Sequence, residues 1–204
     1  MTPARRAMDL LLAGGLLLLL APVIGLIAAL ILLREGRPVF YVAERMKTPE
    51  QGFGLIKFRT MPNGSGDGGV TGGNKGRRLS RFQKLLRKTR ADELPQLWNV
   101  IRGDISLVGP RPPLRKYVEA FPALYAQVLR DRPGITGLAS LVFHSHEERI
   151  LAACESAAAT DAAYRRRCVP RKARLDLIYQ RRRTLCSDLR LIALTAAKPF
   201  RHKS

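Results

Sequence analysis

The residue types best suited to chemistry in this chain are two adjacent carboxylates, Asp92 and Glu93. They stand out because the 204-residue sequence is strongly cationic, with 36 Lys and Arg against 16 Asp and Glu and a formal net charge of +20. Arginine binds phosphate oxygens through paired N–H groups, and Mg²⁺ is held by one or two carboxylates together with substrate phosphates. The pattern therefore indicates phosphoryl transfer, in which positioning and charge neutralisation supply most of the catalysis. The cationic neighbours expected for the pair are Arg87, Arg90, Arg111, Lys57 and Arg59.

Local pattern leaves two roles open for Asp92. It can be the N-cap of a helix that a proline, Pro95, initiates, which is a common arrangement. Alternatively, the arginines and the helix N-terminus keep its carboxyl group ionised at neutral pH. An ionised carboxylate suits a nucleophile or a metal ligand and does not suit a general acid.

The apolar N-terminal stretch predicts a membrane segment. Residues 10–33 contain no charged side chain, and as one helix they would extend about 36 Å, more than the roughly 30 Å hydrocarbon core requires. A cleavable signal peptide is not expected, because the run is long and Arg34 follows where small residues should stand. Arginines flank both ends, which draws both toward the cytoplasm, and Pro22 interrupts the middle. A helix–break–helix hairpin that re-enters one leaflet and a kinked transmembrane helix remain alternatives.

The sequence beyond residue 36 predicts short strands followed by many helices. Two segments of strand composition are expected to pair as a hairpin, 38–43 and 53–59. Helical periodicity predicts a basic helix over 77–90, a helix after the carboxylates and another over 114–131. The last third predicts basic amphipathic helices, which lie flat at a lipid headgroup surface. The helix after the carboxylates is expected to bury Leu94, Leu97, Trp98 and Ile101.

The expected fold is therefore α+β and predominantly helical. It has a membrane-embedded segment, 1–36, and a catalytic domain, 37–204, that carries the small hairpin and the interfacial helices. The glycine-rich residues 63–76 contain a GxGxxG match, but no βαβ unit surrounds it, so a loop is expected there. His144 and His146 lack a third ligand at metal-binding spacing. The three widely spaced cysteines are expected to be reduced thiols.

Several motifs, taken in order, give the chain a close resemblance to a known family. It resembles the bacterial sugar transferase family, the monotopic phosphoglycosyl transferases, also called polyprenyl-phosphate hexose-1-phosphate transferases. The resemblance covers residues 5 to about 200 and places the chain among the small, single-module members. The segments that carry it are Arg6-x-x-Asp9, Ala21-Pro22-Val23-Ile24, residues 57–61 (KFRTM), 92–100 (DELPQLWNV), 103–112 (GDISLVGPRP) and 132–137 (RPGITG).

The resemblance implies a reaction and a set of site residues. A sugar-1-phosphate passes from a UDP-sugar to polyprenyl (undecaprenyl) phosphate in two steps, through a covalent aspartyl phosphosugar, and UMP is released. Asp92 matches the family's nucleophile, and Glu93 matches the second acid, which helps to hold Mg²⁺. The family's phosphate-binding positions are matched by Arg87 and Arg111, and its segment close to the site carries Lys57 and Arg59.

The resemblance also implies a location and partners. The N-terminal helix would be re-entrant, broken at Ala21 and Pro22, and would hold the enzyme on the cytoplasmic face of the bacterial inner membrane. The amphipathic helices would rest on anionic lipids. The lipid-linked product would pass to downstream glycosyltransferases of polysaccharide or glycoconjugate synthesis.

Three departures from the family pattern restrict what it implies. Ala21 stands where the family often has a serine whose hydroxyl can bond the carbonyls freed by the proline. Residues 138–144 (LASLVFH) lack an arginine that members place near the nucleotide sugar, so the donor sugar does not follow from the resemblance. The glycine-rich segment replaces a more polar, helical stretch.

Three other interpretations compete with the enzyme. A membrane-anchored scaffold that binds polyanions would explain the charge but gives no reason for the motifs to occur together. A single-pass enzyme would differ only in membrane topology. Nucleic-acid binding is disfavoured, because aromatic residues make up only 6% of the chain and do not alternate with the basic clusters as stacking platforms require.

Overall fold

The computed structural model describes residues 1–61 and 79–201, and it confirms the α+β class with helices in the majority. The predicted glycine-rich loop, 63–76, lies outside the described residues. In chain order the elements are α1 (Pro3–Glu35), β1 (Phe40–Met46), β2 (Gly52–Phe58), α2 (Arg81–Thr89), the 3₁₀ turn η2 (Ala91–Glu93), α3 (Gln96–Arg102), β3 (Ser106–Val108), α4 (Arg115–Ala120), α5 (Pro122–Val128), β4 (Gly134–Thr136), α6 (Leu138–Val142), α7 (His144–Ala152), α8 (Ala157–Ala163), the π-helical segment η3 (Tyr164–Cys168), α9 (Val169–Arg182) and α10 (Leu185–Arg201).

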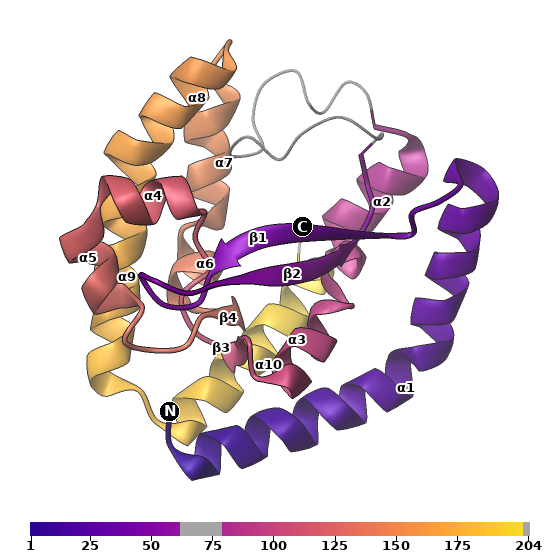
Figure 1. The fold of residues 1–204 in the computed structure, drawn as a ribbon, viewed down its shortest axis with the longest axis horizontal. Helices are drawn as coiled ribbons and strands as arrows, with labels where there is room; N and C mark the ends of the chain where they lie inside the picture. Colours follow the sequence, from indigo (N-terminus) through magenta and orange to yellow (C-terminus); the bar gives the residue numbers. More distant parts are fainter. Residues whose placement is uncertain (62–78, 202–204) are drawn as a thin grey trace.

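Helix α1 is one bent helix and not two separate ones. It continues through Pro22, which removes a single hydrogen-bond donor and tilts the helix without ending it. Figure 1 shows the indigo helix turning a corner, so that one arm passes below the domain and the other rises beside it. By length and composition α1 is the one described helix able to cross a membrane.

Both arms of α1 contact the domain that follows. Near the N-terminus, Arg6 donates to the carbonyls of Val100 (2.6 Å) and Ile101 (2.7 Å) at the end of α3. The buried carboxylate of Asp9 accepts a hydrogen bond from the N–H of Leu107 (3.1 Å) on β3. The other arm packs through its own buried residues against the hairpin and α2, in a cluster of Ile27, Ile31, Phe58 and Leu86.

The predicted hairpin is confirmed and is tied to the helix that follows the carboxylates. Strands β1 and β2 pair antiparallel from Phe40↔Phe58 to Met46↔Gly52. The fully buried side chain of Asn99 on α3 bonds the backbone of β2 as a neighbouring strand would. It accepts from Ile56 N (3.0 Å) and donates to Gly54 O (2.8 Å). The hairpin therefore has a fixed position relative to the carboxylates.

A second, parallel pair of short strands brings two distant motifs together. Ser106 on β3 pairs with Gly134 on β4, and the N–H of Gly109 donates to the carbonyl of Thr136 at 2.8 Å. A Cβ at Gly134 would stand 2.2 Å from the backbone nitrogen of Gly109, closer than atoms pack. Glycine is needed here for the close approach of two backbones, and that approach sets the course of the chain into Arg111.

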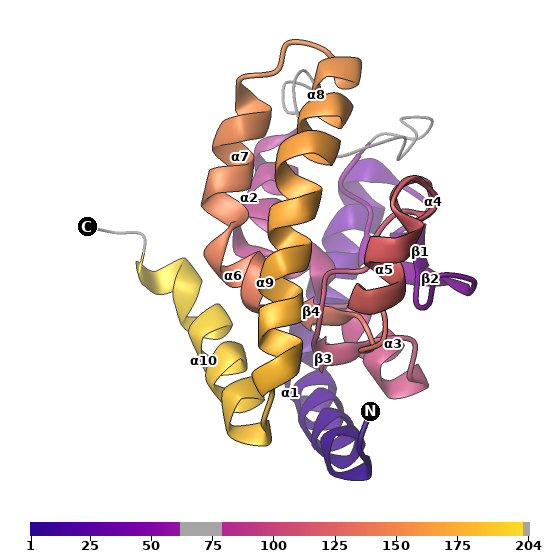
Figure 2. The same cartoon turned by 90° about the vertical axis from the view of Figure 1, so that its left-hand side faces the viewer.

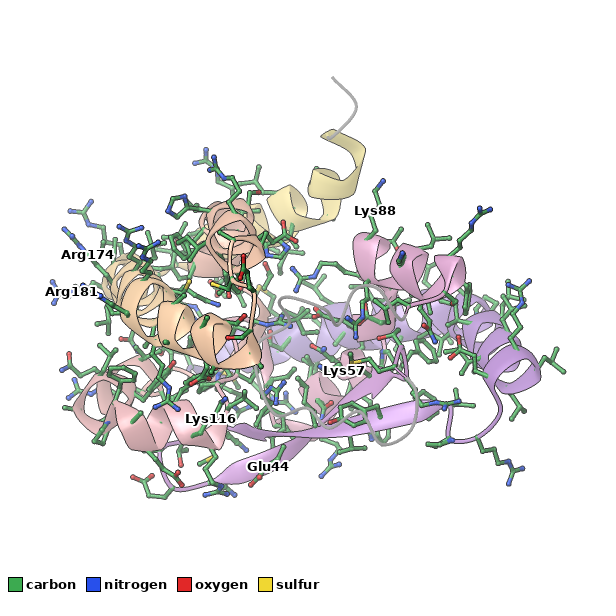
Figure 3. All side chains as sticks on the ribbon, turned by 90° about the horizontal axis from the view of Figure 1, so that it is seen from above. Glu44, Lys57, Lys88, Lys116, Arg174 and Arg181 are labelled. Carbon is green, nitrogen blue, oxygen red and sulfur yellow. The ribbon has the colours of Figure 1, made fainter. Side chains whose placement is uncertain are left out.

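The helices of the last third form a layer on one side of the strands. Figure 2 shows α7, α8 and α9 close together and α10 diverging from them. Arg174 and Arg181 point outward from α9 (Figure 3). Two expectations are corrected: the helix predicted over 114–131 is divided at Pro122 into α4 and α5, and Trp98 is half exposed instead of buried.

Candidate active site

The two carboxylates lie on a tight turn between α2 and α3. Arg90 ends α2 in the left-handed conformation (φ 58°, ψ 20°), and its carbonyl accepts from the N–H of Glu93 (3.1 Å) to close the turn. Helix α3 begins only at Gln96, and no side chain caps its N-terminus. The N-cap interpretation of Asp92 is therefore wrong.

Glu93 is held between two arginines. Its Oε1 accepts from Arg111 Nη2 at 2.8 Å, and both of its oxygens accept from Arg90 Nη2, at 3.2 and 3.0 Å. Burial alone would raise the pKa of this carboxyl, but Arg111 and Arg90 outweigh burial and lower the pKa to about 2. Glu93 is thus a permanently charged group with few free lone pairs.

Asp92 has the opposite environment. Within residues 1–61 and 79–201 its carboxylate makes no hydrogen bond or ion pair in the structure. Burial, reinforced by the negative charge of Glu93, raises its pKa to about 6, while Lys57, Arg87 and Arg111 pull the pKa down. The expectation that its surroundings favour the charged form is corrected, because desolvation outweighs the cations. At pH 7 the carboxylate is still mostly ionised and poorly solvated, and none of the described residues forms a hydrogen bond or ion pair with it.

The cations that act on Asp92 converge from three elements. Lys57 comes from β2, Arg87 from α2 and Arg111 from the segment after β3. Arg87 is oriented by its own hydrogen bond, from Nε to Thr60 Oγ1 at 2.9 Å. In Figure 3, Lys57 lies in the middle of the molecule, whereas Lys88 of α2 points outward. The structure therefore brings three of the four predicted phosphate-binding residues to the carboxylates.

Arg59, the fourth, makes hydrogen bonds to the end of α1. Its buried guanidinium donates to the carbonyls of Glu35 (2.8 Å) and Gly36 (2.7 Å), where the last turn of α1 leaves its acceptors unsatisfied. A cation is also favoured there by the helix dipole. These bonds anchor the end of α1 to the segment that follows β2, and the expectation that Arg59 also binds phosphate stays a prediction.

We expect Arg59→Met to destabilise the fold by about 1–3 kcal/mol, because it removes charge-assisted hydrogen bonds from partly buried carbonyls. Arg59→Lys should recover part of that loss. Thermal unfolding measures the stability, and the KM for the sugar donor should stay within about threefold in the lysine variant. A large rise in KM at unchanged stability would instead support the phosphate-binding role.

A polar cluster from the last third extends the site, and the sequence offered no local signal for it. Lys172 on α9 donates to both oxygens of Glu147 (3.1 and 3.0 Å) and to Tyr164 Oη (3.3 Å), and both ion-pair partners are largely buried. Glu147 and Tyr164 act electrostatically on Arg111. Tyr164 opens the π-helical segment η3, a geometry that often occurs at functional sites. Residues from α7, η3 and α9 thus lie beside the residues from β2, α2 and the turn.

The family follows from comparison with known sequences. A family model described as bacterial sugar transferase matches residues 1–202. The chain belongs to the bacterial sugar transferase family.

Three relatives named as sugar-phosphate transferases or as an exopolysaccharide production protein match about two thirds or more of this chain, but only part of their own length. It is 38% identical to a UDP-N-acetylgalactosamine-undecaprenyl-phosphate N-acetylgalactosaminephosphotransferase from Aeromonas hydrophila, over 68% of this chain and 34% of that protein. It is 37% identical to the exopolysaccharide production protein ExoY of Rhizobium meliloti, over 66% of this chain and 67% of that protein. It is 30% identical to a UDP-glucose:undecaprenyl-phosphate glucose-1-phosphate transferase from Klebsiella pneumoniae, over 98% of this chain and 41% of that protein. The chain thus spans less than half of two of these relatives.

The donor atoms of this member of the family fit a Mg²⁺ ion shared between protein and substrate, and they do not fit a site closed by protein ligands alone. Among the described residues, no group of three or more His, Cys, Asp or Glu could hold a metal. His144 and His146 instead contact Glu148 and Arg171. Asp92 offers carboxylate oxygens that no described residue pairs with, of the hard type that Mg²⁺ prefers, and the remaining positions would be filled by substrate phosphates and water.

Proposed function

We propose that the protein transfers a sugar-1-phosphate from a UDP-sugar to undecaprenyl phosphate, as the names of its Aeromonas and Klebsiella relatives describe for those proteins. The observation that carries the proposal is the contrast between two adjacent carboxylates. Glu93 is neutralised by arginines, while Asp92 is ionised and desolvated and has no hydrogen-bond or ion-pair partner in the described part of the chain. Neighbouring acids with divergent pKa values are typical of sites where each acid has its own role.

In the first step, an oxygen of Asp92 attacks the β-phosphorus of the UDP-sugar. An Asp–O–P bond forms, the bond from that phosphorus to the bridging oxygen breaks, and UMP leaves with the electron pair. In the second step, a phosphate oxygen of the lipid attacks the same phosphorus, and the Asp–O–P bond breaks. The products are the lipid diphosphate sugar and the regenerated carboxylate.

The cations of the site neutralise the charge that this chemistry concentrates. Lys57, Arg87 and Arg111 act electrostatically on the Asp92 carboxylate, and in this proposal they bind the oxygens of the transferred phosphoryl group. Mg²⁺, when bound by Asp92, with Glu93 beside it, and by the donor's phosphates, would supply further positive charge at the leaving UMP. The poor solvation of Asp92 makes it more nucleophilic toward phosphorus.

The contacts of α1 support a re-entrant topology. Arg6 and Asp9 near its start, and Ile31 near its end, all pack on the same domain. One domain cannot occupy both sides of a bilayer, whereas a helix bent at Pro22 can enter one leaflet and return. Arginines at both ends favour the cytoplasmic side. The protein is therefore proposed to sit on the cytoplasmic face of the inner membrane, with its exposed apolar and basic helices toward anionic lipid.

The decisive experiment is UMP release by protein in nanodiscs, with Mg²⁺, undecaprenyl phosphate and a panel of UDP-sugars. Release with one donor, lost on chelation of Mg²⁺ with EDTA, is expected. Absence of release with every donor, from folded protein, would favour the scaffold interpretation. Topology is tested separately in a cysteine-free variant that carries Pro3→Cys, which should be labelled only from the cytoplasmic side.

A further inference from the structure

The residue that joins α2 to the catalytic turn has an unusual backbone. Arg90 is the only non-glycine residue with positive φ among the described residues. The left-handed conformation costs a side-chain-bearing residue about 1–2 kcal/mol relative to the right-handed one, and at a helix C-terminus it is normally occupied by glycine. Glycine would satisfy the backbone of this turn at lower cost. The presence of arginine therefore calls for a function of its side chain.

The side chain of Arg90 adds a second link across the turn that its backbone already closes. Its Nη2 reaches both oxygens of Glu93, three residues later, while its backbone carbonyl accepts from the N–H of the same residue. Ala91 and Asp92 are enclosed between these two links. The nucleophile is thus held on a loop that is fastened at both ends.

The contact with Arg90 also determines which face of Arg111 remains available. Arg111 contacts only Oε1 of Glu93, and Arg90 covers Oε2. Without Arg90, Glu93 would be free to take a two-oxygen pair with Arg111, which would occupy a second N–H group of that guanidinium. Arg111 remains about one-third exposed, so its other donors are accessible to a substrate.

We propose that Arg90 is a positioning residue for phosphosugar transfer, acting through Glu93 to orient Asp92 and to keep N–H groups of Arg111 free for the phosphoryl group while it is transferred. The inference rests on the proposed function and adds a residue that the resemblance does not assign. Arg90 does not contact the substrate in this scheme. Its removal should therefore affect the rate of the chemical step more than the binding of the donor.

The test is a kinetic comparison of Arg90→Gly, Arg90→Lys and the wild type by UMP release. The glycine variant suits the left-handed backbone and lacks only the side chain, so it should remain folded, with a melting temperature within about 3 °C of wild type. Its kcat should fall by about 10–100-fold, as expected for a misplaced nucleophile, with KM for the UDP-sugar changed less than about threefold. Arg90→Lys, which can reach one oxygen of Glu93, should recover part of the kcat.

A matched control removes a neighbouring cation that has no such contact. Lys88, in the last turn of α2, points outward (Figure 3), and Lys88→Met should keep wild-type kinetics. Wild-type kcat in Arg90→Gly would overturn the inference, and so would a rise in KM at unchanged kcat, which would mean direct contact with substrate. If the glycine variant does not fold, the kcat of Arg90→Lys decides: a loss supports positioning and wild-type kinetics refute it. Absence of UMP release in the wild type would instead refute the proposed function.

Discussion

Asp92→Asn is expected to abolish UMP release and, at the same time, to stabilise the protein at pH 7. The activity is lost because an amide oxygen is a poor nucleophile toward phosphorus. The stability rises because the folded state raises the pKa of this carboxyl from 3.8 to about 6. Between these values the folded protein binds more protons than the unfolded chain, so stability falls as the pH rises through that window. Above pH 6 the ionised carboxylate of Asp92 destabilises the fold by its full amount, which we estimate at about 1–3 kcal/mol after allowing for partial exposure.

The measurement is thermal unfolding of wild type and Asp92→Asn at pH 7 and at pH 4, in EDTA to exclude bound metal. The stabilisation should be present at pH 7 and should shrink toward pH 4, where the wild-type carboxyl is protonated in the folded state. Equal stability of the two proteins at pH 7 would mean that Asp92 is better solvated or better paired than its surroundings indicate. UMP release at the wild-type rate would exclude it as the nucleophile.

Glu93→Gln is the matched control. It also replaces a carboxylate by an amide, one residue away, but the expected change in stability has the opposite sign. The pKa of Glu93 is lowered from 4.5 to about 2, so its charge stabilises the fold above pH 4.5, and that contribution is lost as the pH falls toward 2. The amide leaves Arg90 and Arg111 without a counter-charge. We expect the free energy of unfolding to fall by about 1–3 kcal/mol at pH 7 in Glu93→Gln, whereas it should rise in Asp92→Asn.

Gly134→Ala is expected to destabilise the domain by about 3 kcal/mol or more, or to prevent its folding. The new Cβ would lie 2.2 Å from the nitrogen of Gly109 and 2.5 Å from the carbonyl carbon of Val108. Both neighbours are backbone atoms of the paired strand, so no side chain can rotate away to relieve the overlap. Separation of β3 from β4 would also displace Arg111, which follows two residues after Gly109.

Gly14→Ala supplies the control for this prediction, because a Cβ at Gly14 in α1 meets no atom within 4 Å. That variant should unfold at or slightly above the wild-type temperature, since alanine is favoured over glycine in a helix. Yield of folded protein and thermal unfolding are compared for both variants. A Gly134→Ala protein as stable as wild type would show that the two strands can separate without cost.

Adjacent residues and local composition allowed the membrane segment, the hairpin and the carboxylate pair to be predicted. A run of 24 residues without a charged side chain predicts a membrane segment, and this prediction does not depend on which residues the segment packs against. The strand composition of the two hairpin segments and the adjacency of Asp92 and Glu93 are equally local. The class of chemistry followed from charge type, because adjacent acids in a cationic chain are suited to a phosphate or a metal.

Distances across the chain could not be predicted, and they decided the roles of individual side chains. Arg59 lies only two residues from Lys57, yet it serves the end of α1 because that helix returns to β2 in the folded protein. Trp98 lies at a helical position that local periodicity assigns to the core, but it is half exposed. Lys172 reaches the site from a helix 80 residues beyond the carboxylates.

By itself, the sequence determined which residues can carry charge, enter a membrane or act as a nucleophile, since these are properties of residue types and near neighbours. Only the tertiary structure decided the pKa values of the two carboxylates. Burial and the positions of Arg90 and Arg111 raise the pKa of Asp92 and lower that of Glu93, although the two side chains are adjacent and chemically alike. Desolvation and Coulomb interactions depend on distances in space, so groups distant in sequence set the chemistry of neighbours.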